Sequence, residues 1–302
     1  MHQLTLSAPV SVTGIGLHTG KTSTMTFCPA PENYGYVFQR IDLAEKPCVA
    51  ALAENVADTS RGTTIADNEA KVYTVEHALS ALVGLGIDNV HIEIDGPEPP
   101  ILDGSAKFFI EALTKVPLIP QHAERKYISI SEKIEYIEAE RGVHLIIEPA
   151  DDFSLQVKVD YNSPVLLPQE AVLANINDFA QEIAPCRTFC FLREIEMMFK
   201  AGLIQGGSLD NAIVIADREI SEEELADLAK LLQRPAIKVQ KGILNTVHLQ
   251  FENEPARHKL LDLVGDLALT GGFLKAKVTA LRPGHKANTE LAKKIREQGK
   301  MK

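Results

Sequence analysis

Short runs of β-branched and aromatic residues, some with alternating apolar and polar positions, are separated by Gly, Pro and Asn along much of the chain. In the first half they predict strands at Thr5 to Val12, Lys21 to Phe27, Tyr36 to Ile41 and Asn89 to Ile94. Longer apolar segments predict helices from Tyr73 to Leu85 and near Ala106 to Leu113. The stretch from Val116 to His122 has two prolines and no period, so we expect a domain boundary near residue 122.

The second half repeats this plan. It predicts strands at Tyr127 to Ile130, Val143 to Glu148, Phe153 to Val159 and Phe273 to Ala280, and a helix from Ala256 to Leu269. Strands that outnumber small groups of helices are typical of an α+β fold. We therefore expect two related α+β domains, residues 1–122 and 123–302, each a sheet covered by helices.

One helical segment occurs twice and supports this duplication. His77 to Gly84 reads His-Ala-Leu-Ser-Ala-Leu-Val-Gly, and His258 to Gly265 reads His-Lys-Leu-Leu-Asp-Leu-Val-Gly. The second copy adds Asp262 and Asp266, which follow His258 by four and eight residues and share its helix face. Two copies of one helix imply two related halves.

If the duplicated helices pack side by side, His77, His258 and Asp262 form a metal-binding set. Three protein ligands leave one position open on tetrahedral zinc, as in catalytic sites. Fe²⁺ also suits two nitrogens and one oxygen. Glu76 precedes the first His and is placed to accept a proton from metal-activated water. From the residues alone, each His is equally well explained as a helix cap or a packed core residue.

Composition narrows the class of protein. The 302 residues are 45% hydrophobic and 24% charged, with a formal net charge of −10, which favours a globular protein and argues against nucleic acid as a partner. The chain has no run of eighteen apolar residues and no signal-peptide pattern at Met1, so we expect a cytoplasmic protein without a transmembrane segment. Cys186 and Cys190 lack a second pair at metal spacing and are interpreted as packing residues.

Two segments have no counterpart in the first half. Residues 188–215 are rich in large apolar side chains, namely Phe189, Phe191, Leu192, Ile195, Met197, Met198, Phe199, Leu203 and Ile204. Residues 219–244 include an acidic helix candidate, Ser221 to about Leu232, that begins with a capping serine. The glycine-rich segment Gly14 to Gly20 precedes a strand where a dinucleotide motif needs a helix, so it predicts a hairpin turn.

Several of these motifs, taken in order, resemble those of the UDP-3-O-acyl-N-acetylglucosamine deacetylases, the zinc hydrolases of lipid A synthesis. The likeness rests on Thr74-Val-Glu-His77, His258-Lys-Leu-Leu-Asp262 and Gly284-His285, and on the segments Gly14 to Gly20, Gly86 to Asn89, Leu102 to Ala106, Arg187 to Phe189 and Gly206 to Ser208. It implies a fold in which helices are sandwiched between two sheets, with an active site at the domain junction.

The resemblance also implies roles for single residues. His77, His258 and Asp262 bind zinc, Glu76 is the general base, and His285 is a second catalytic group positioned by Asp266. Thr188 helps to polarise the amide carbonyl. The implied contacts with the substrate, a UDP-linked acyl aminosugar, are Lys259, Phe189, Gly207 and Ser208, with Phe153 near the uridine and Arg282 at the diphosphate. By itself, a His after Gly in a loop is more typical of a surface residue.

The same resemblance implies that residues 188–215 form an apolar passage for the acyl chain, lined by residues such as Ile195 and Ile204. The alternative from the residues alone is a packed core helix. Each methylene buried in such a passage contributes about 0.8 kcal/mol to binding. The resemblance therefore implies a passage that can bind a long acyl group and sense its length.

The chain departs from this family pattern in two places. Residues 219–244 are longer than in many relatives, and the charged run Lys293 to Lys302 predicts a frayed helix or a cut linker. Some relatives continue into a hydroxyacyl-carrier-protein dehydratase domain, so we expect a fused or associated dehydratase beyond this chain. Three alternatives remain open: a non-catalytic nucleotide-sugar or acyl-binding protein, a protein with a structural metal, and a different amidohydrolase.

Overall fold

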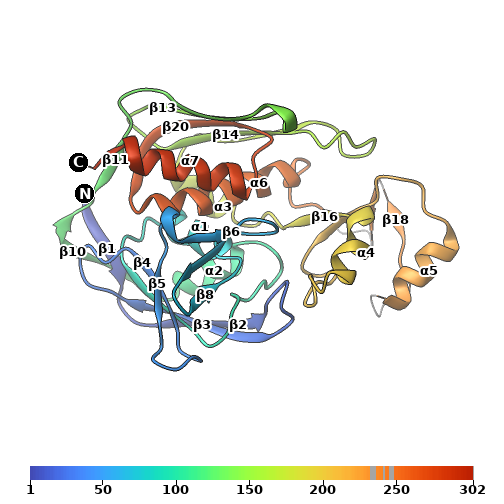
Figure 1. Ribbon diagram of the computed structural model, residues 1–302, viewed down its shortest axis with the longest axis horizontal. Helices are drawn as coiled ribbons and strands as arrows, with labels where there is room; N and C mark the ends of the chain where they lie inside the picture. Colours follow the sequence, from blue (N-terminus) through green and yellow to red (C-terminus); the bar gives the residue numbers. More distant parts are fainter. Residues whose placement is uncertain (232–235, 241, 245–247, 302) are drawn as a thin grey trace.

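The computed structural model of the chain describes residues 1–231, 236–240, 242–244 and 248–301, and it has two layers of sheet with helices between them (Figure 1). The first sheet has the strand order β2 (Val10–Ile15), β3 (Thr22–Pro29), β9 (Val90–Ile94), β4 (Tyr36–Arg40) and β5 (Cys48–Ala50). The second contains, in order, β12 (Ile134–Glu138), β13 (Val143–Pro149), β20 (Phe273–Leu281), β14 (Ser154–Val159) and β15 (Gln169–Leu173). This arrangement confirms the α+β prediction.

The two sheets share one plan of strand directions. In each, a central strand, β9 or β20, runs antiparallel to one neighbour and parallel to the other. Each of those neighbours then has an antiparallel outer partner. Additional elements apart, the strands and helices of the two layers follow the same order along the chain: four strands, a helix, the central strand and a second helix. The duplication indicated by the repeated helix segment therefore extends to the whole layer.

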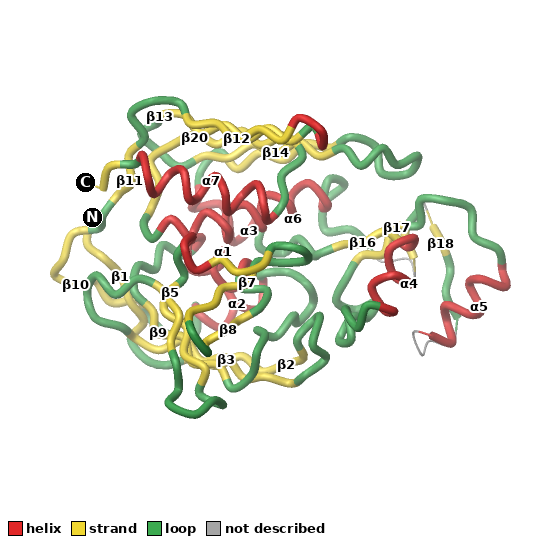
Figure 2. Tube along the Cα trace, in the orientation of Figure 1, coloured by secondary structure: helices red, strands yellow, loops and turns green. Residues whose placement is uncertain are grey.

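The helices that fill the space between the sheets are α1 (Glu76–Gly84), α2 (Lys107–Leu113), α6 (Glu254–Leu267) and α7 (His285–Gln298) (Figure 2). Helices α1 and α6 are the duplicated pair and pack on each other. A Cβ built on Gly265 would lie 2.0 Å from the Glu76 carbonyl oxygen, so the repeated glycine allows this close approach. Leu79, Leu82, Leu260, Leu263 and Val264 are fully buried along the pair.

Smaller elements complete the two layers. They are the sheet of β6 (Val56–Asp58), β7 (Thr64–Asp67) and β8 (Ala70–Val72), the pair β1 (His2–Leu6) and β10 (Leu118–Glu124), the strands β11 (Tyr127–Ser129) and β21 (Lys300–Met301) on the edge of β20, helix α3 (Phe179–Glu182), and the 3₁₀ turns Ala53–Asn55, Ala139–Arg141, Ile176–Asp178 and Ala268–Thr270. Both chain ends lie on the same side of the molecule (Figure 1).

The segment after β16 (Phe189–Phe191) forms a separate unit that projects from the layers (Figure 1). It contains α4 (Leu192–Lys200), β17 (Ile213–Ile215), α5 (Glu222–Leu231), β18 (Val239–Gln240) and β19 (Ile243–Leu244), and its strands pair in the order β16, β17, β19, β18. A small apolar core of its own includes Ile195, Met198 and Val214. The predicted acidic helix is confirmed as α5, although Leu232 and the other residues up to 235 lie outside the described part.

Three sequence predictions need correction. The strand expected from Thr5 to Val12 is two strands, β1 and β2, because the chain turns at Ser7 to Pro9. The stretch 116–122 was predicted to be irregular, yet most of it belongs to β10, which pairs with β1. The charged run 293–302 is neither a frayed helix nor a linker in its described part, since it completes α7 and continues into β21.

The hairpin predicted at Gly14 to Gly20 is confirmed, because β2 and β3 pair from Ile15 and Thr22 onwards. The change from one sheet to the other falls between Ile94 and Tyr127, and the domain boundary near residue 122 stays a prediction. Within the described ranges, no helix combines the length and apolar character needed to cross a membrane.

Candidate metal centre and active site

His77, at the start of α1, meets His258 and Asp262 of α6 between the two halves. Their candidate ligand atoms lie within 4.8 Å of one another, and all three residues are buried. His258 Nε2 is 3.3 Å and His77 Nε2 is 3.7 Å from Asp262 Oδ1. The imidazole rings stand edge to face with centroids 5.1 Å apart. The metal-binding set expected from the duplicated helices is therefore assembled in space.

The chemistry of this cluster fits a divalent cation. Asp262 Oδ1 and His77 Nδ1 are buried and have no hydrogen-bond partner among the described residues. His258 Nδ1 lies 3.0 Å from the Cys186 carbonyl oxygen, so this nitrogen carries the proton and Nε2 is left with its lone pair. Burial and the neighbouring His258 lower the pKa of His77 to about 3, which keeps the imidazole neutral. Neutral imidazoles and an ionised carboxylate are the forms that bind metal.

Glu76 lies at the first position of α1, beside the cluster, and is 2% exposed. Its Oε2 accepts a hydrogen bond of 3.0 Å from the Thr63 backbone N–H, and its Oε1 is 3.9 Å from His285 Nε2. Burial raises the pKa of the carboxyl to about 7, against the opposing effect of His285. A carboxyl with this pKa can both accept and return a proton at neutral pH.

His285 opens α7 and points towards the cluster from the other side. Its Nδ1 is 3.1 Å from Asp266 Oδ2, and its Nε2 is 4.0 Å from Asp262 Oδ2. Burial alone would lower the pKa of His285, but the carboxylates of Asp266 and Glu76 raise it to about 9. The interpretation of this His as a loop residue is wrong, because it is the first residue of a helix and is largely buried.

The carboxylate of Asp266 is fixed from several directions. It is fully buried and accepts hydrogen bonds from the Thr63 hydroxyl and, at 2.9 Å, from Asn288 Nδ2, besides its contact with His285. Thr63 thus contacts Glu76 through its backbone and Asp266 through its side chain. Sequence reasoning missed Thr63, since nothing in its local pattern distinguishes it from other strand-preceding residues.

A cavity of about 270 Å³ gives access to this cluster. Its lining includes Glu76, His77, Thr188, Phe189, His258, Lys259, Asp262 and His285. Lys259 Nζ lies 2.5 Å from Asp262 Oδ2 and 5.6 Å from the centroid of the Phe189 ring. Although burial opposes the charged form, Asp262 holds the pKa of Lys259 above its ordinary value. The cavity therefore carries a fixed positive charge at its wall.

A second, more apolar cavity of about 130 Å³ adjoins the first. Leu17, Arg61, Thr188, Phe189, Cys190 and Glu194 line both cavities. The second cavity is completed by residues of the projecting unit, among them Ile195, Met198, Ile204, Gly207 and Ser208. The buried face of α4 therefore does two things, because Ile195 and Met198 pack in the unit's own core and also line the cavity. The side chain of Phe199, also named from sequence, lies outside the described part.

Comparison with known proteins places these features in one family. The family model described as UDP-3-O-acyl N-acetylglycosamine deacetylase matches residues 3–230 and 224–297. The chain is 40% identical over 295 residues to the UDP-3-O-acyl-N-acetylglucosamine deacetylase of an Anaeromyxobacter species, covering 97% of this chain and 88% of that one. The chain belongs to the UDP-3-O-acyl N-acetylglycosamine deacetylase family.

Two longer relatives have a higher sequence identity to this chain. The chain is 48% identical over 301 residues to a protein named bifunctional enzyme LpxC/FabZ from Chlorobaculum tepidum, and 46% identical over 299 residues to one of the same name from Bacteroides thetaiotaomicron. These matches cover 98% and 99% of this chain but only 64% and 65% of those proteins. The chain thus spans just under two thirds of the length of these relatives.

Phe153 is expected near the uridine from the resemblance to this deacetylase family, and that role stays a prediction. Phe153 is 8% exposed in the main apolar core and lines neither of these two cavities. It precedes β14, whereas the cavity is reached beyond the other end of that strand, where Tyr161 lines it. Tyr161 packs edge to face on Phe189 with ring centroids 5.6 Å apart. Tyr161, two residues beyond the end of β14, is therefore an aromatic residue in the wall of the cavity at the cluster.

Arg282 lies three residues before His285 and also lines neither cavity. Its guanidinium is 2.9 Å from Asp160 Oδ2, and both side chains are about one-third exposed. Arg282 is thus paired with the neighbour in sequence of Tyr161, whose side chain lines the cavity at the cluster.

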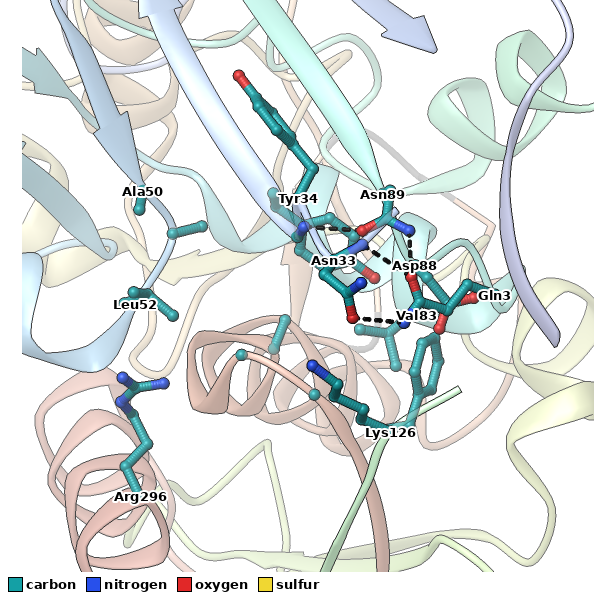
Figure 3. Close-up of a pocket in the computed structure, with 17 residues that line it drawn as sticks. Gln3, Asn33, Tyr34, Ala50, Leu52, Val83, Asp88, Asn89, Lys126 and Arg296 are labelled. Carbon is teal, nitrogen blue, oxygen red and sulfur yellow. Dashed lines mark hydrogen bonds between the residues drawn. The ribbon is translucent and has the colours of Figure 1, made fainter. Parts of the chain in front are cut away.

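A larger cavity of about 320 Å³ opens elsewhere, near the C-terminal ends of α1 and α6 (Figure 3). None of the site residues predicted from sequence lines it. Polar side chains in its wall are hydrogen-bonded to one another, since Asn89 and Asn33 both bond to the Gln3 side chain. The cluster of His77, His258 and Asp262 thus lies in a smaller cavity than this one.

Proposed function

We propose that the chain is a metal-dependent deacetylase that hydrolyses the N-acetyl group of a UDP-3-O-acyl-N-acetylglucosamine and releases acetate, a step of lipid A biosynthesis. The observation that carries this proposal is that a His, His, Asp cluster and the Glu76 carboxyl line one cavity, with an apolar cavity adjoining it. Membership of the deacetylase family supports the substrate class.

The metal assigned to His77, His258 and Asp262 is Zn²⁺, with Fe²⁺ as the second candidate. Zinc bound by these residues would supply Lewis acidity towards an amide carbonyl and make water acidic enough to lose a proton near neutral pH. Three protein ligands are typical of catalytic zinc, whereas structural zinc has four. The ligand set therefore favours catalysis over a purely structural clamp.

The proton transfers fall to Glu76 and His285. Hydrolysis adds hydroxide to the acetyl carbon and a proton to the amine that leaves. Glu76 Oε1 is the free oxygen that accepts a proton from the attacking water, because Oε2 is held by the Thr63 N–H. The cation on His285, oriented by Asp266, stabilises negative charge on the carbonyl oxygen or donates to the leaving nitrogen. The Thr188 side chain lies in the same wall and completes the polar surface facing the carbonyl.

The remaining predicted contacts divide between the two cavities. Lys259 supplies the positive charge in the metal cavity, and Phe189 lies at the junction. The acyl chain is assigned to the apolar cavity lined by Ile195, Ile204, Gly207 and Ser208. Arg282 is assigned to the diphosphate, because its bidentate geometry suits phosphate oxygens, and Phe153 is assigned to the uridine.

The test is elemental analysis of the purified protein combined with a deacetylase assay on the UDP-linked monoacyl sugar. About one zinc or iron per chain and release of acetate are expected. Binding of the sugar without acetate release would indicate a non-catalytic binding protein. A metal with four protein ligands and no turnover would indicate a structural site, and turnover of other amides in preference to this sugar would indicate a different amidohydrolase.

Two further assignments complete the proposal. A cytoplasmic location stays a prediction from the sequence pattern. A fused or associated dehydratase also stays a prediction, supported by the length of the bifunctional relatives beyond the region that this chain matches.

A further inference from the structure

Glu98 is a buried carboxylate near the site to which sequence reasoning assigned no role. It is 1% exposed. Its segment reads Gly96-Pro-Glu-Pro-Pro100, and the backbone is held on both sides, by the Tyr73 N–H on Pro97 O and the Ser23 hydroxyl on Glu98 O. Its position is therefore rigid.

The carboxylate is satisfied entirely by hydrogen bonds from two loops. From the β2–β3 hairpin it accepts the backbone N–H of His18 at 3.1 Å, and the backbone N–H and hydroxyl of Thr19 at 2.9 and 2.8 Å. From the other side it accepts the Thr74 hydroxyl at 2.9 Å. Thr74 lies two residues before Glu76 and has a left-handed backbone with φ of 51°. Glu98 thus joins the hairpin loop to the segment that begins the metal-binding helix.

Glycines allow the hairpin loop to close on this carboxylate and on the projecting unit. A Cβ on Gly16 would lie 2.5 Å from Glu98 Oε2, and a Cβ on Gly206 would lie 2.2 Å from the Gly16 carbonyl oxygen. The Gly206 N–H donates to Leu17 O at 3.0 Å. The loop is therefore wedged between Glu98 and the turn that carries Ile204 and Gly207.

This loop forms part of the wall between the two cavities. Leu17 lines both, and His18 lines the apolar one together with Ile204. Any displacement of the loop changes the shape of the apolar cavity next to the metal cluster. Since no metal ligand contacts Glu98 directly among the described hydrogen bonds, such a change leaves the ligand set in place.

We propose that Glu98 is a positioning residue that holds the 16–20 loop against the apolar cavity and thereby sets the enzyme's preference for the acyl group of its substrate. This rests on the proposed function, which places an acyl chain in that cavity. Removing the negative charge weakens four hydrogen bonds at once, three of them from the hairpin loop. The loop then yields where it meets the acyl chain.

The test compares wild type with Glu98→Gln, which keeps the size of the side chain but replaces one acceptor oxygen with a donor. KM for a long-acyl substrate is expected to rise about tenfold or more, because hydrogen bonds to a charged group are among the stronger ones. KM and kcat for a short-acyl analogue should change much less, and metal content should be unchanged. Equal changes for both substrates, or no change, would overturn the proposal.

Matched variants keep the test valid if Glu98→Gln folds poorly. Thr19→Val removes one donor to the carboxylate and should shift the long-to-short KM ratio in the same direction, whereas Thr19→Ser keeps the hydroxyl and should restore it. Asp88 is a carboxylate whose side chain is 9% exposed, bonded to Arg125 and lining the other cavity (Figure 3). Asp88→Asn should lower Tm without altering the long-to-short KM ratio. If this variant changes the ratio as much as Glu98→Gln does, the effect of Glu98 is general destabilisation and the proposal is wrong.

Calorimetric binding of the long-acyl and short-acyl UDP-sugars to the same variants separates this proposal from the proposed function. Wild type that binds both sugars without releasing acetate would contradict the deacetylase assignment alone. A long-to-short affinity ratio that Glu98→Gln leaves unchanged would contradict the positioning role alone.

Discussion

Asp262 contacts more of the cluster than any other single residue described above, since its carboxylate faces His77, His258, Lys259 and His285. Burial alone would raise its pKa, but His258 and Lys259 hold that pKa well below the ordinary value, so the carboxylate stays ionised. An ionised, buried and partly unsatisfied oxygen is stable only beside positive charge. The ionised Asp262 carboxylate therefore favours a bound cation at this position.

Asp262→Ala and His258→Ala are expected to lose metal and activity together, because each removes a proposed ligand. Zinc content by elemental analysis and acetate release measure the two effects. Asp266→Asn is the matched comparison, since Asp266 lies one turn further along α6 and contacts His285 instead of the ligand atoms. It should keep the metal and lower kcat. Near-normal turnover with stoichiometric zinc in Asp262→Ala would eliminate the proposed site.

Glu76→Ala should keep the metal and lose most of its activity, because a general base typically contributes roughly 10² to 10⁴-fold to the rate. Single-turnover kinetics on zinc-loaded protein measure the loss. If zinc occupancy falls as far as in His77→Ala, Glu76 is a ligand instead. An unchanged rate would remove it from the mechanism.

At the scale of elements, the repeated glycine of the duplicated helices shows how packing and chemistry are joined. The Gly265 position faces the Glu76 backbone, and the equivalent Gly84 faces the Phe179 ring, where a Cβ would lie 2.1 Å from Cδ1. The same residue type thus permits a backbone contact in one copy and a side-chain contact in the other. Only the first contact adjoins the proposed base.

Gly265→Ala is expected to separate the start of α1 from α6 and so to lower both the free energy of unfolding, by roughly 1 to 3 kcal/mol, and the affinity for zinc. Gly84→Ala is the paired control. It should also lower stability, because Phe179 must move, but it should leave zinc affinity and kcat close to wild type. Thermal unfolding and zinc titration of both variants make the comparison. Equal zinc affinities in the two variants would contradict the proposed coupling.

The apolar cavity belongs to α4 and the turn that follows it, which the duplicated layers do not require. Ile195→Trp is therefore expected to raise KM for a long-acyl substrate far more than for a short-acyl analogue, with metal content unchanged. The alternative of a pure core helix predicts a lower Tm with equal effects on both substrates. Parallel losses on the two substrates would show that Ile195 acts through packing alone.

At the scale of the whole molecule, the proposed metal joins the two related halves. One ligand comes from the half that carries the first sheet, and two come from the half that carries the second. A ligand that binds only the folded state stabilises it in proportion to the logarithm of its concentration over Kd. Metal bound at the junction should therefore stabilise the packing of the two layers, in addition to its proposed role in the reaction.

Removal of the metal with a chelator should lower Tm, and added zinc should restore it. Asp262→Ala supplies the control, because its Tm should respond to neither treatment. Differential scanning calorimetry at fixed protein concentration measures Tm for both proteins, after the chelator and after zinc is added. A wild-type Tm that does not depend on the metal would show that the ion contributes to catalysis without contributing to the junction.

Local patterns predict several elements of both layers and the candidate ligand set. The repeated segment at His77 and His258 predicts two related halves, and the i, i+4 spacing of His258 and Asp262 places both side chains on one face of a helix. The second helix of the second half, α7, was missed because its charged residues hide its apolar face. The repeat itself indicates it, since α2 holds the same place in the first half.

Only the tertiary structure decided which distant residues share the site. Thr63, Tyr161 and Glu98 lie on loops with no distinguishing local pattern, and they reach the site because strands of different layers end there. Phe153 and Tyr161 flank opposite ends of β14, and sequence alone does not say which end faces the cluster. Hydrophobic periodicity reports which face of an element is buried. It does not report which other chain segment lies against that face, because contacts between segments depend on how the layers stack.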